Sequence, residues 1–122
     1  DTMFNFEKLG VWQDAIAFAD LVYKLTRPFP DGERFGLTNQ MRRAAVSISS
    51  NIAEGSSRSS RTDFARFVEI AAGSVFEVVS QATISRRRGY LEESKYALLY
   101  AGAEKQSRML SGLRKSLLGA KS

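Results

Sequence analysis

The side chains best suited to chemistry in this sequence are its arginines. Arginine accounts for twelve of the 18 basic residues, and the densest groups lie near positions 42, 58 and 86. A guanidinium is a planar fork of donors that matches phosphate oxygens, so clustered arginines favour contact with a nucleic-acid backbone. The candidate nucleic-acid contacts are Arg42, Arg58, Arg61, Arg86, Arg87 and Arg88.

Two residue types that dominate catalytic and metal sites are missing. The chain has no histidine and no cysteine, which removes the common zinc, copper and haem ligand sets and every histidine-dependent triad. Aspartate, glutamate, lysine and serine chemistry remains, but no pair of such residues is spaced convincingly for it. We therefore expect a non-enzymatic protein with no catalytic residue, no metal site and no cofactor.

Arg43 has a structural interpretation beside the functional one. It adjoins an apolar helical stripe and could pair with Glu54, Glu69 or Glu77, either inside the fold or at a subunit contact. We favour this structural role for Arg43, whereas for Arg42 phosphate contact and a structural ion pair stay equally open.

Asn51 and Glu54 are unusual residues near a helix C-terminus, where a carboxylate opposes the helix dipole. Arg58 or Arg61, across the following turn, is the nearest candidate to compensate that charge. We expect Arg43, Asn51 and Glu54 to form a structural polar cluster.

The two remaining basic groups also allow two interpretations each. The turn 56–61 and the helix start after it could cradle a phosphate with free N–H groups and arginines, or could be a solvated turn. Arg86, Arg87 and Arg88 could contact an RNA backbone, or could simply complement the dipole at a helix end.

The elements that must position these residues are helices. The chain of 122 residues, 43% hydrophobic, suits one domain over 1–122. Apolar residues recur with helical spacing in four segments, and both prolines fall in one loop, at 28–36. We expect helices at roughly 9–26, 38–54, 62–88 and 91–118, which with short connections give an all-α, antiparallel up-down-up-down four-helix bundle.

Local signals refine this expectation. Thr38 is a good N-cap for the second helix, and Gly55 is placed to end it in a left-handed conformation. Phe29 and Phe35 are expected to attach the proline loop to the core. On the fourth helix, Tyr96 and Tyr100 lie towards the outer side and are candidates for a partner surface.

The first and third helices each carry apolar residues over about half of their circumference, more than one-sided packing needs. Either these helices lie deep in the bundle or one stripe meets another subunit. We find no apolar run of membrane-spanning length and no signal-peptide pattern, so we expect a cytoplasmic protein that is not bound to a membrane.

The order of several motifs resembles a known family. The residues that carry the resemblance are Leu9-Gly10-Val11-Trp12, Phe29-Pro30, Phe35-Gly36-Leu37, Gln40-Met41-Arg42-Arg43-Ala44-Ala45-Val46-Ser47-Ile48, Asn51-Ile52-Ala53-Glu54-Gly55, Arg58, Phe64, Arg66-Phe67, Ile70-Ala71-Ala72-Gly73-Ser74, Glu77 and Gly89-Tyr90-Leu91. They are similar to the small bundle proteins encoded in intervening sequences of bacterial 23S ribosomal RNA genes, which are often labelled ribosomal-protein-like.

The resemblance covers almost the whole chain. It implies a left-handed four-helix bundle that assembles as a ring-like homopentamer, and it extends to an accessory protein that works with a reverse transcriptase and its RNA. The family does not supply a biochemical activity. One position departs from the family pattern, because Ser49 stands where relatives usually have a mid-helix proline, so the second helix could be straighter here.

Two functional hypotheses follow. In the first, the protein is a nucleic-acid-associated module that binds structured RNA through basic patches, since a net charge of +5 permits this without requiring it. In the second, it is a protein-interaction scaffold, for example an accessory subunit of a reverse transcriptase or a ribosome-associated factor, and its RNA affinity is incidental.

Overall fold

The fold is built from four long helices. A computed structural model describes residues 4–119, and within them lie α1 (Gly10–Thr26), α2 (Leu37–Ser56), α3 (Arg61–Arg87) and α4 (Glu93–Leu117). Two short 3-10 helices precede α1 and α2, namely η1 (Asn5–Lys8) and η2 (Asp31–Glu33). No strand occurs in this part of the chain, which confirms the all-α prediction, and each long helix begins and ends within two residues of its expected range.

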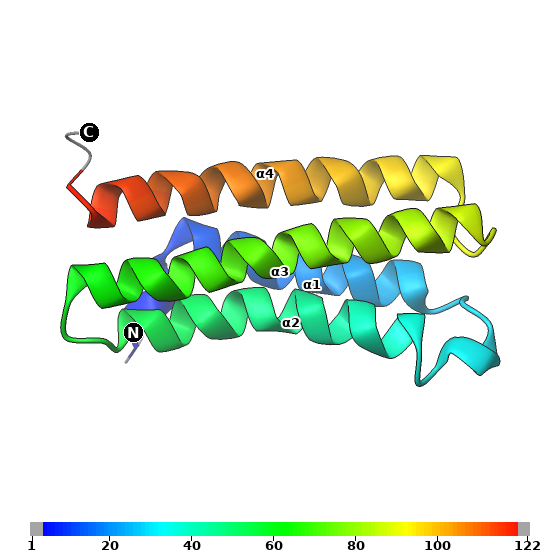
Figure 1. Ribbon diagram of the computed structural model, residues 1–122, viewed down its shortest axis with the longest axis horizontal. Helices are drawn as coiled ribbons and strands as arrows, with labels where there is room; N and C mark the ends of the chain where they lie inside the picture. The colour runs from blue at the N-terminus through cyan, green and yellow to red at the C-terminus, as the bar shows by residue number, and fades with distance from the viewer. Residues whose placement is uncertain (1–3, 120–122) are drawn as a thin grey trace.

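The helices form a bundle in which each one runs antiparallel to the helix before it (Figure 1). Contacts join α1 to α2, α2 to α3, α3 to α4 and α4 back to α1, so every helix packs against two others. Two ends result. The α1–α2 and α3–α4 connections share one end, and the α2–α3 connection shares the other with η1 and the last turn of α4. The left-handed twist of the bundle stays a prediction.

The core is aliphatic and contains many alanines, which lets the helices approach closely. Its largest fully buried apolar side chains are Met41, Ile48, Ile52, Leu99, Leu110, Val22, Val68, Val75 and Val78. On α1 the buried stripe is the one through Val11, Ala15 and Phe18, whereas Ile16 and Tyr23 on the neighbouring stripe remain exposed. Helix α1 is therefore not deep in the bundle. Its second apolar stripe is covered only in part, since Ala19 is buried and Trp12 packs against the core.

Gly55 does not end α2 in a left-handed conformation, contrary to expectation. The helix continues through Gly55 to Ser56, and Ser57 follows with φ of −86°. A Cβ at Gly55 would lie 2.7 Å from the Cβ of Phe67 and 2.8 Å from a ring carbon of Phe64. Glycine is needed here because α2 and α3 approach closely. Left-handed glycines do follow the two later helices, Gly89 after α3 (φ 82°) and Gly119 after α4 (φ 93°).

Thr38 is not the N-cap of α2. The helix begins one residue earlier, at Leu37, whose N–H donates to a carboxylate oxygen of Glu33 at 3.1 Å. Gly36 makes room for that carboxylate, because a Cβ there would lie 2.6 Å from it. The predicted capping role thus belongs to Glu33, and the Thr38 hydroxyl is left for other contacts.

The loop before α2 is attached by only one of its two phenylalanines. Phe29 is buried and packs against Tyr90 with ring centroids 5.7 Å apart, whereas Phe35 is 81% exposed. The expectation that both rings attach the loop was wrong for Phe35, since the turn at Gly36 directs it outward and its ring carries the Arg34 guanidinium instead.

Ser49, which stands where relatives usually have proline, lies inside α2. Its hydroxyl donates to the carbonyl of Val46 at 3.1 Å, in place of the kink that a proline would give.

Helix α3 has the length and apolar composition to cross a membrane, contrary to the expectation that no segment does. However, 44% of its most apolar window is buried inside the bundle. That apolar surface packs against α2 and α4, so the composition has a structural explanation within the fold.

Candidate nucleic-acid interface

Positive charge gathers at one end of the bundle. We call this the basic end and define it as residues 24–42 and 86–95, where α1 ends, α2 begins, α3 ends and α4 begins. The Tyr90 hydroxyl donates to Glu33 at 3.2 Å and joins the two segments. Eight cationic side chains meet four carboxylates there, so this end carries a net charge of +4, most of the net +5 of the chain.

Four guanidiniums at the basic end lie over aromatic rings. The distances from the guanidinium carbon to the ring centroid are 4.8 Å for Arg34 over Phe35, 4.6 Å for Arg42 over Tyr23, 4.0 Å for Arg86 over Tyr96 and 5.8 Å for Arg88 over Tyr90. Such stacking orients a guanidinium and leaves its edge donors available to an anion.

The three consecutive arginines after α3 have different partners. Arg86 pairs with Glu93 at 3.4 Å, across the turn to α4, and Arg88 donates to the Tyr90 hydroxyl at 3.4 Å. The contact with Tyr90 raises the pKa of Arg88 above its ordinary value. Arg87 is exposed and makes no ion pair with the part of the chain described, which leaves its full set of donors open to solvent.

Arg42 lies where α1 ends. Its Nε donates to the Thr26 hydroxyl at 2.9 Å, and its Nη2 donates to the Tyr23 carbonyl at 3.3 Å. Both acceptors belong to the last turn of α1, where backbone carbonyls such as that of Tyr23 lack helical partners. Arg42 therefore has a structural role, with one terminal nitrogen, Nη1, left over.

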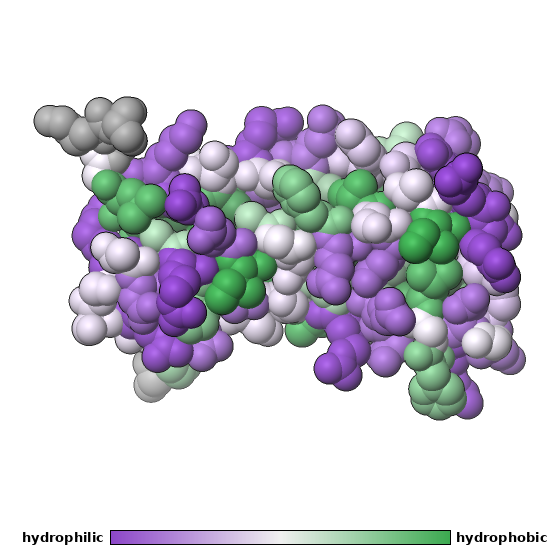
Figure 2. All heavy atoms as spheres, in the orientation of Figure 1, coloured by the Kyte–Doolittle hydropathy of each residue, from purple (hydrophilic) through white to green (hydrophobic). Residues whose placement is uncertain are grey.

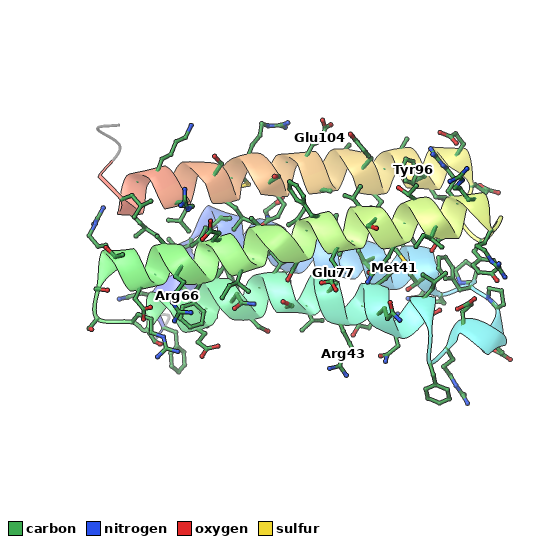
Figure 3. All side chains as sticks on the ribbon, viewed as in Figure 1. Met41, Arg43, Arg66, Glu77, Tyr96 and Glu104 are labelled. Atoms are coloured by element: carbon green, nitrogen blue, oxygen red, sulfur yellow. The ribbon has the colours of Figure 1, made fainter. Side chains whose placement is uncertain are left out.

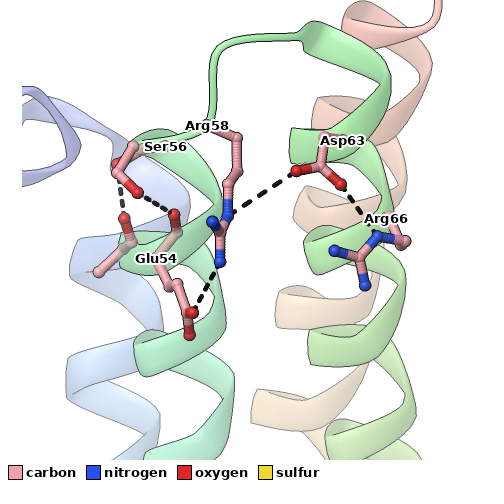
Figure 4. A network of polar contacts seen from close by, with 7 residues as sticks. Glu54, Ser56, Arg58, Asp63 and Arg66 are labelled. Carbon is pink, nitrogen blue, oxygen red and sulfur yellow. Dashed lines mark hydrogen bonds and ion pairs between the residues drawn. The ribbon is translucent and has the colours of Figure 1, made fainter.

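At the opposite end, the arginines of the α2–α3 turn are occupied by internal contacts. Arg58 pairs with Glu54 at 2.9 Å and with Asp63 at 3.8 Å, and Arg66 pairs with Asp63 at 3.0 Å (Figure 4). Arg58 and Arg66 also each lie 4.6 Å from the Phe67 ring centroid. The charge of Glu54 is thus compensated by Arg58, one of the two candidates named from the sequence.

The predicted phosphate cradle at the same turn has few free donors. The hydroxyls of Ser56 and Ser57 donate to carbonyls of α2 at 2.7 Å, and the Ser60 hydroxyl accepts from the Asp63 N–H at 3.0 Å. Arg61 donates to the carbonyls of Ser116 and Leu117 at 2.6 and 3.2 Å, in the last turn of α4. The turn is a closed polar network next to two carboxylates.

The structure separates these two groups of arginines. Helix α3 joins them, and its 27 residues at 1.5 Å each place the groups about 40 Å apart. Arg42, Arg86, Arg87 and Arg88 lie together at the basic end, whereas Arg58 and Arg61 lie at the other end.

Arg43 does not join a polar cluster with Asn51 and Glu54. It is exposed and its guanidinium points outward from α2 (Figure 3), although Arg43 and Glu77 line the same surface hollow between α2 and α3. No ion pair connects it to another described residue, so an internal pairing of Arg43 was wrong for the isolated protomer. Asn51 instead donates to the carbonyl of Ser47 at 2.8 Å.

A groove runs between α3 and α4, away from the basic end. It has a volume of about 310 Å³ and is lined by Val75, Phe76, Val79, Tyr100, Ala103, Glu104 and Ser107. Figure 2 shows apolar surface in a broken band along these two helices. Of the two tyrosines predicted to face a partner, Tyr100 lines this groove, whereas the Tyr96 ring is covered by Arg86.

Four cationic residues of the basic end were missed by sequence reasoning: Lys24, Arg27, Arg34 and Lys95. They are isolated in the sequence, so charge density alone does not reveal them. The predicted antiparallel topology could have identified them, because it brings the end of the first helix beside the start of the fourth. Over residues 4–119, no three acidic side chains come together in a way that could hold a metal ion.

Comparisons with known proteins place this geometry in a family. The chain is similar to a protein of unknown function from the S23 ribosomal protein family of Bacteroides thetaiotaomicron, whose crystal structure has a TM-score of 0.79 at 23% sequence identity, with 86% of this chain and 95% of that chain covered. At that identity the likeness shows a shared fold. A search of curated protein sequences found no match. The family model for 23S rRNA-intervening sequence proteins matches residues 7–112, and the chain belongs to that family.

Proposed function

We propose that this protein binds structured RNA without catalysing a reaction, and that the basic end makes the contacts. The observation that carries the proposal is the net charge of +4 at this end, presented by guanidiniums that aromatic rings hold in place. Such a surface recognises a phosphate backbone and its shape, because the aromatic rings described at this end are either buried or carry a guanidinium on one face, and so form no platform for stacking bases. Arg58 and Arg61 are left out of the interface, since their donors are already used.

Binding to structured ribosomal RNA over a salt series tests the proposal, with double-stranded DNA of equal length as the competitor. We expect RNA to bind more tightly and log affinity to fall linearly with log salt. Equal affinity for the two polymers, or binding that vanishes at physiological salt, would contradict the proposal.

A matched pair of variants locates the interface. The double substitution Arg87→Gln with Lys95→Gln removes two exposed charges at the basic end that make no ion pair with the described residues. It should lower the slope of log affinity against log salt by about 1.5. The control, Arg108→Gln with Lys115→Gln, removes two exposed charges on the later part of α4 and should leave the slope close to the original. Equal losses in the two variants would show that the charge acts non-specifically.

A protein-interaction scaffold is a second candidate function. The α3–α4 groove supports it, because Phe76 is 70% exposed at its edge beside Tyr100. If this function is correct, a stoichiometric protein partner remains bound after nuclease treatment of a native lysate, and Phe76→Ser releases it. Loss of every co-purifying protein on nuclease treatment would instead favour the RNA function.

We also infer a closed homo-oligomer, a pentamer by the family resemblance, in the cytoplasm. Supporting this are large apolar side chains that the protomer leaves exposed, among them Ile16, Tyr23, Val46, Ile70, Phe76, Ile84, Leu98 and Tyr100. They lie on all four long helices, so each protomer has apolar side chains on more than one face, and a ring uses two different faces of each copy.

A further inference from the structure

A small cavity at the basic end combines three arginines with two threonine hydroxyls. It lies where the end of α1, the loop with η2 and the first turns of α2 meet, and its volume is about 150 Å³. Arg27, Arg34 and Arg42 line it, and its one acidic residue is Asp31. One water needs only about 10–15 Å³ measured in the same way, so the cavity has room for a tetrahedral oxyanion.

Thr38 places a hydroxyl among the arginines of this cavity. The residue is 9% exposed and lines the cavity, and no hydrogen bond joins its hydroxyl to the described residues. Its side chain is not used to cap α2, because Glu33 has that role. The hydroxyl is therefore available as a further donor to an anion in the cavity, at the first turn of a helix.

The arginines around the cavity retain donors for such an anion. Arg42 is held by Thr26 and Tyr23 and keeps Nη1 free. Arg27 and Arg34 are exposed and make no ion pair with the described residues, and Arg34 is stacked on Phe35. This gives the outward Phe35 ring a role, since it fixes the orientation of a guanidinium at the mouth of the cavity.

We propose that this cavity binds one terminal phosphate group, a phosphate monoester. The inference deepens the proposed function and rests on it for the source of the phosphate, the end of an RNA strand. A terminal group carries up to two negative charges and three free oxygens, which suits several guanidiniums and a hydroxyl in one concave site. A phosphodiester inside a strand must leave the cavity on both sides, whereas residues of the loop with η2, from Phe29 to Arg34, form one of its walls.

The test compares three forms of one RNA strand: with a 5′-phosphate, with a 3′-phosphate and with neither. We expect one phosphorylated form to bind about tenfold more tightly than the unphosphorylated strand, and excess inorganic phosphate to remove that difference. The second proton of a phosphate monoester dissociates at about pH 6, so the preference should be larger at pH 7.5 than at pH 5.5.

Variants separate the cavity from the general charge of the basic end. Thr38→Val keeps the shape and should reduce the preference about fivefold, and Arg34→Gln should reduce it about tenfold. Asp31→Asn should increase it. Arg87→Gln, outside the cavity, should weaken all three strands equally and leave the preference unchanged.

The outcomes are distinguishable. Equal binding of all three strands would overturn the proposal that the cavity binds a terminal phosphate, and would leave the proposed RNA binding intact. Binding of inorganic phosphate, sensitive to Thr38→Val, without affinity for any RNA would support the cavity and remove the proposed function. A preference that Thr38→Val and Arg34→Gln leave unchanged would place the phosphate elsewhere and overturn the inference.

Discussion

At the scale of single residues, Arg61 illustrates how a guanidinium can complete a helix that is distant in the sequence. It donates to the carbonyls of Ser116 and Leu117 from the first residue of α3. Arg42 does the same at the end of α1. In both cases a positive charge meets the negative end of a helix dipole and satisfies carbonyls that lack helical partners.

Arg61→Ala should therefore destabilise the fold. The lost contacts are exposed to solvent, so we expect a decrease of about 0.5–1 kcal/mol in the free energy of unfolding, measured by urea denaturation. Arg87→Ala is the control, because it removes the same charge without removing an internal contact, and it should change stability by less than about 0.5 kcal/mol. Equal effects of the two substitutions would show that Arg61 does not cap α4.

Which of these arginines are available to a ligand could not be predicted from the sequence. Their density marked Arg58 and Arg61 as readily as Arg87. The difference arises from Glu54, Asp63 and the last carbonyls of α4, which reach the turn only through the fold. The Thr38 hydroxyl was missed for a similar reason, since its free state depends on Glu33 reaching Leu37.

At the scale of helices, the close approach of α2 and α3 depends on Gly55. A side chain there would collide with the Cβ of Phe67, which cannot move without its backbone. Gly73, also in a helix, has nothing within 4 Å of an added Cβ. Substitution by alanine at these two glycines should thus have opposite effects on the stability of the fold.

Gly55→Ala should lower the unfolding free energy, because overpacking costs about 1–3 kcal/mol and outweighs the helix propensity gained. Gly73→Ala should raise it by roughly 0.5–1 kcal/mol, since alanine loses less conformational freedom in a helix. Thermal unfolding of the two variants beside the unmodified protein measures both. Stabilisation by Gly55→Ala would refute the close contact.

The helices themselves were accessible to sequence reasoning because their signals are local. The positions where the chain turns are indicated by the apolar spacing, by the prolines at 28 and 30 and by Gly89. The helix ends predicted from these signals lie within two residues of those in the structure. The prediction for Gly55 was wrong because it used a local rule for helix ends. Glycine is needed at this position for close packing against another helix, which the local sequence does not show. The exposure of Phe35 likewise depends on the turn at Gly36.

At the scale of the whole molecule, the exposed apolar side chains bear on assembly. If copies meet through the α3–α4 groove, Phe76→Ser should dissociate the oligomer and leave the folded protomer, as Phe76 is 70% exposed within one chain. Light scattering gives the mass and circular dichroism the helix content. A monodisperse monomer of the unmodified protein at micromolar concentration would rule out the oligomer.

The location of charge along the bundle has a further physical consequence. A rod with most of its excess charge at one pole experiences a torque near a polyanion, and long-range attraction then turns the rod before contact. The described chain ends, near residues 4 and 119, both lie at the opposite pole (Figure 1). A protein tethered to a sensor surface by either terminus would therefore present its charged pole to the solution, and rotation about the tether would have little influence on capture.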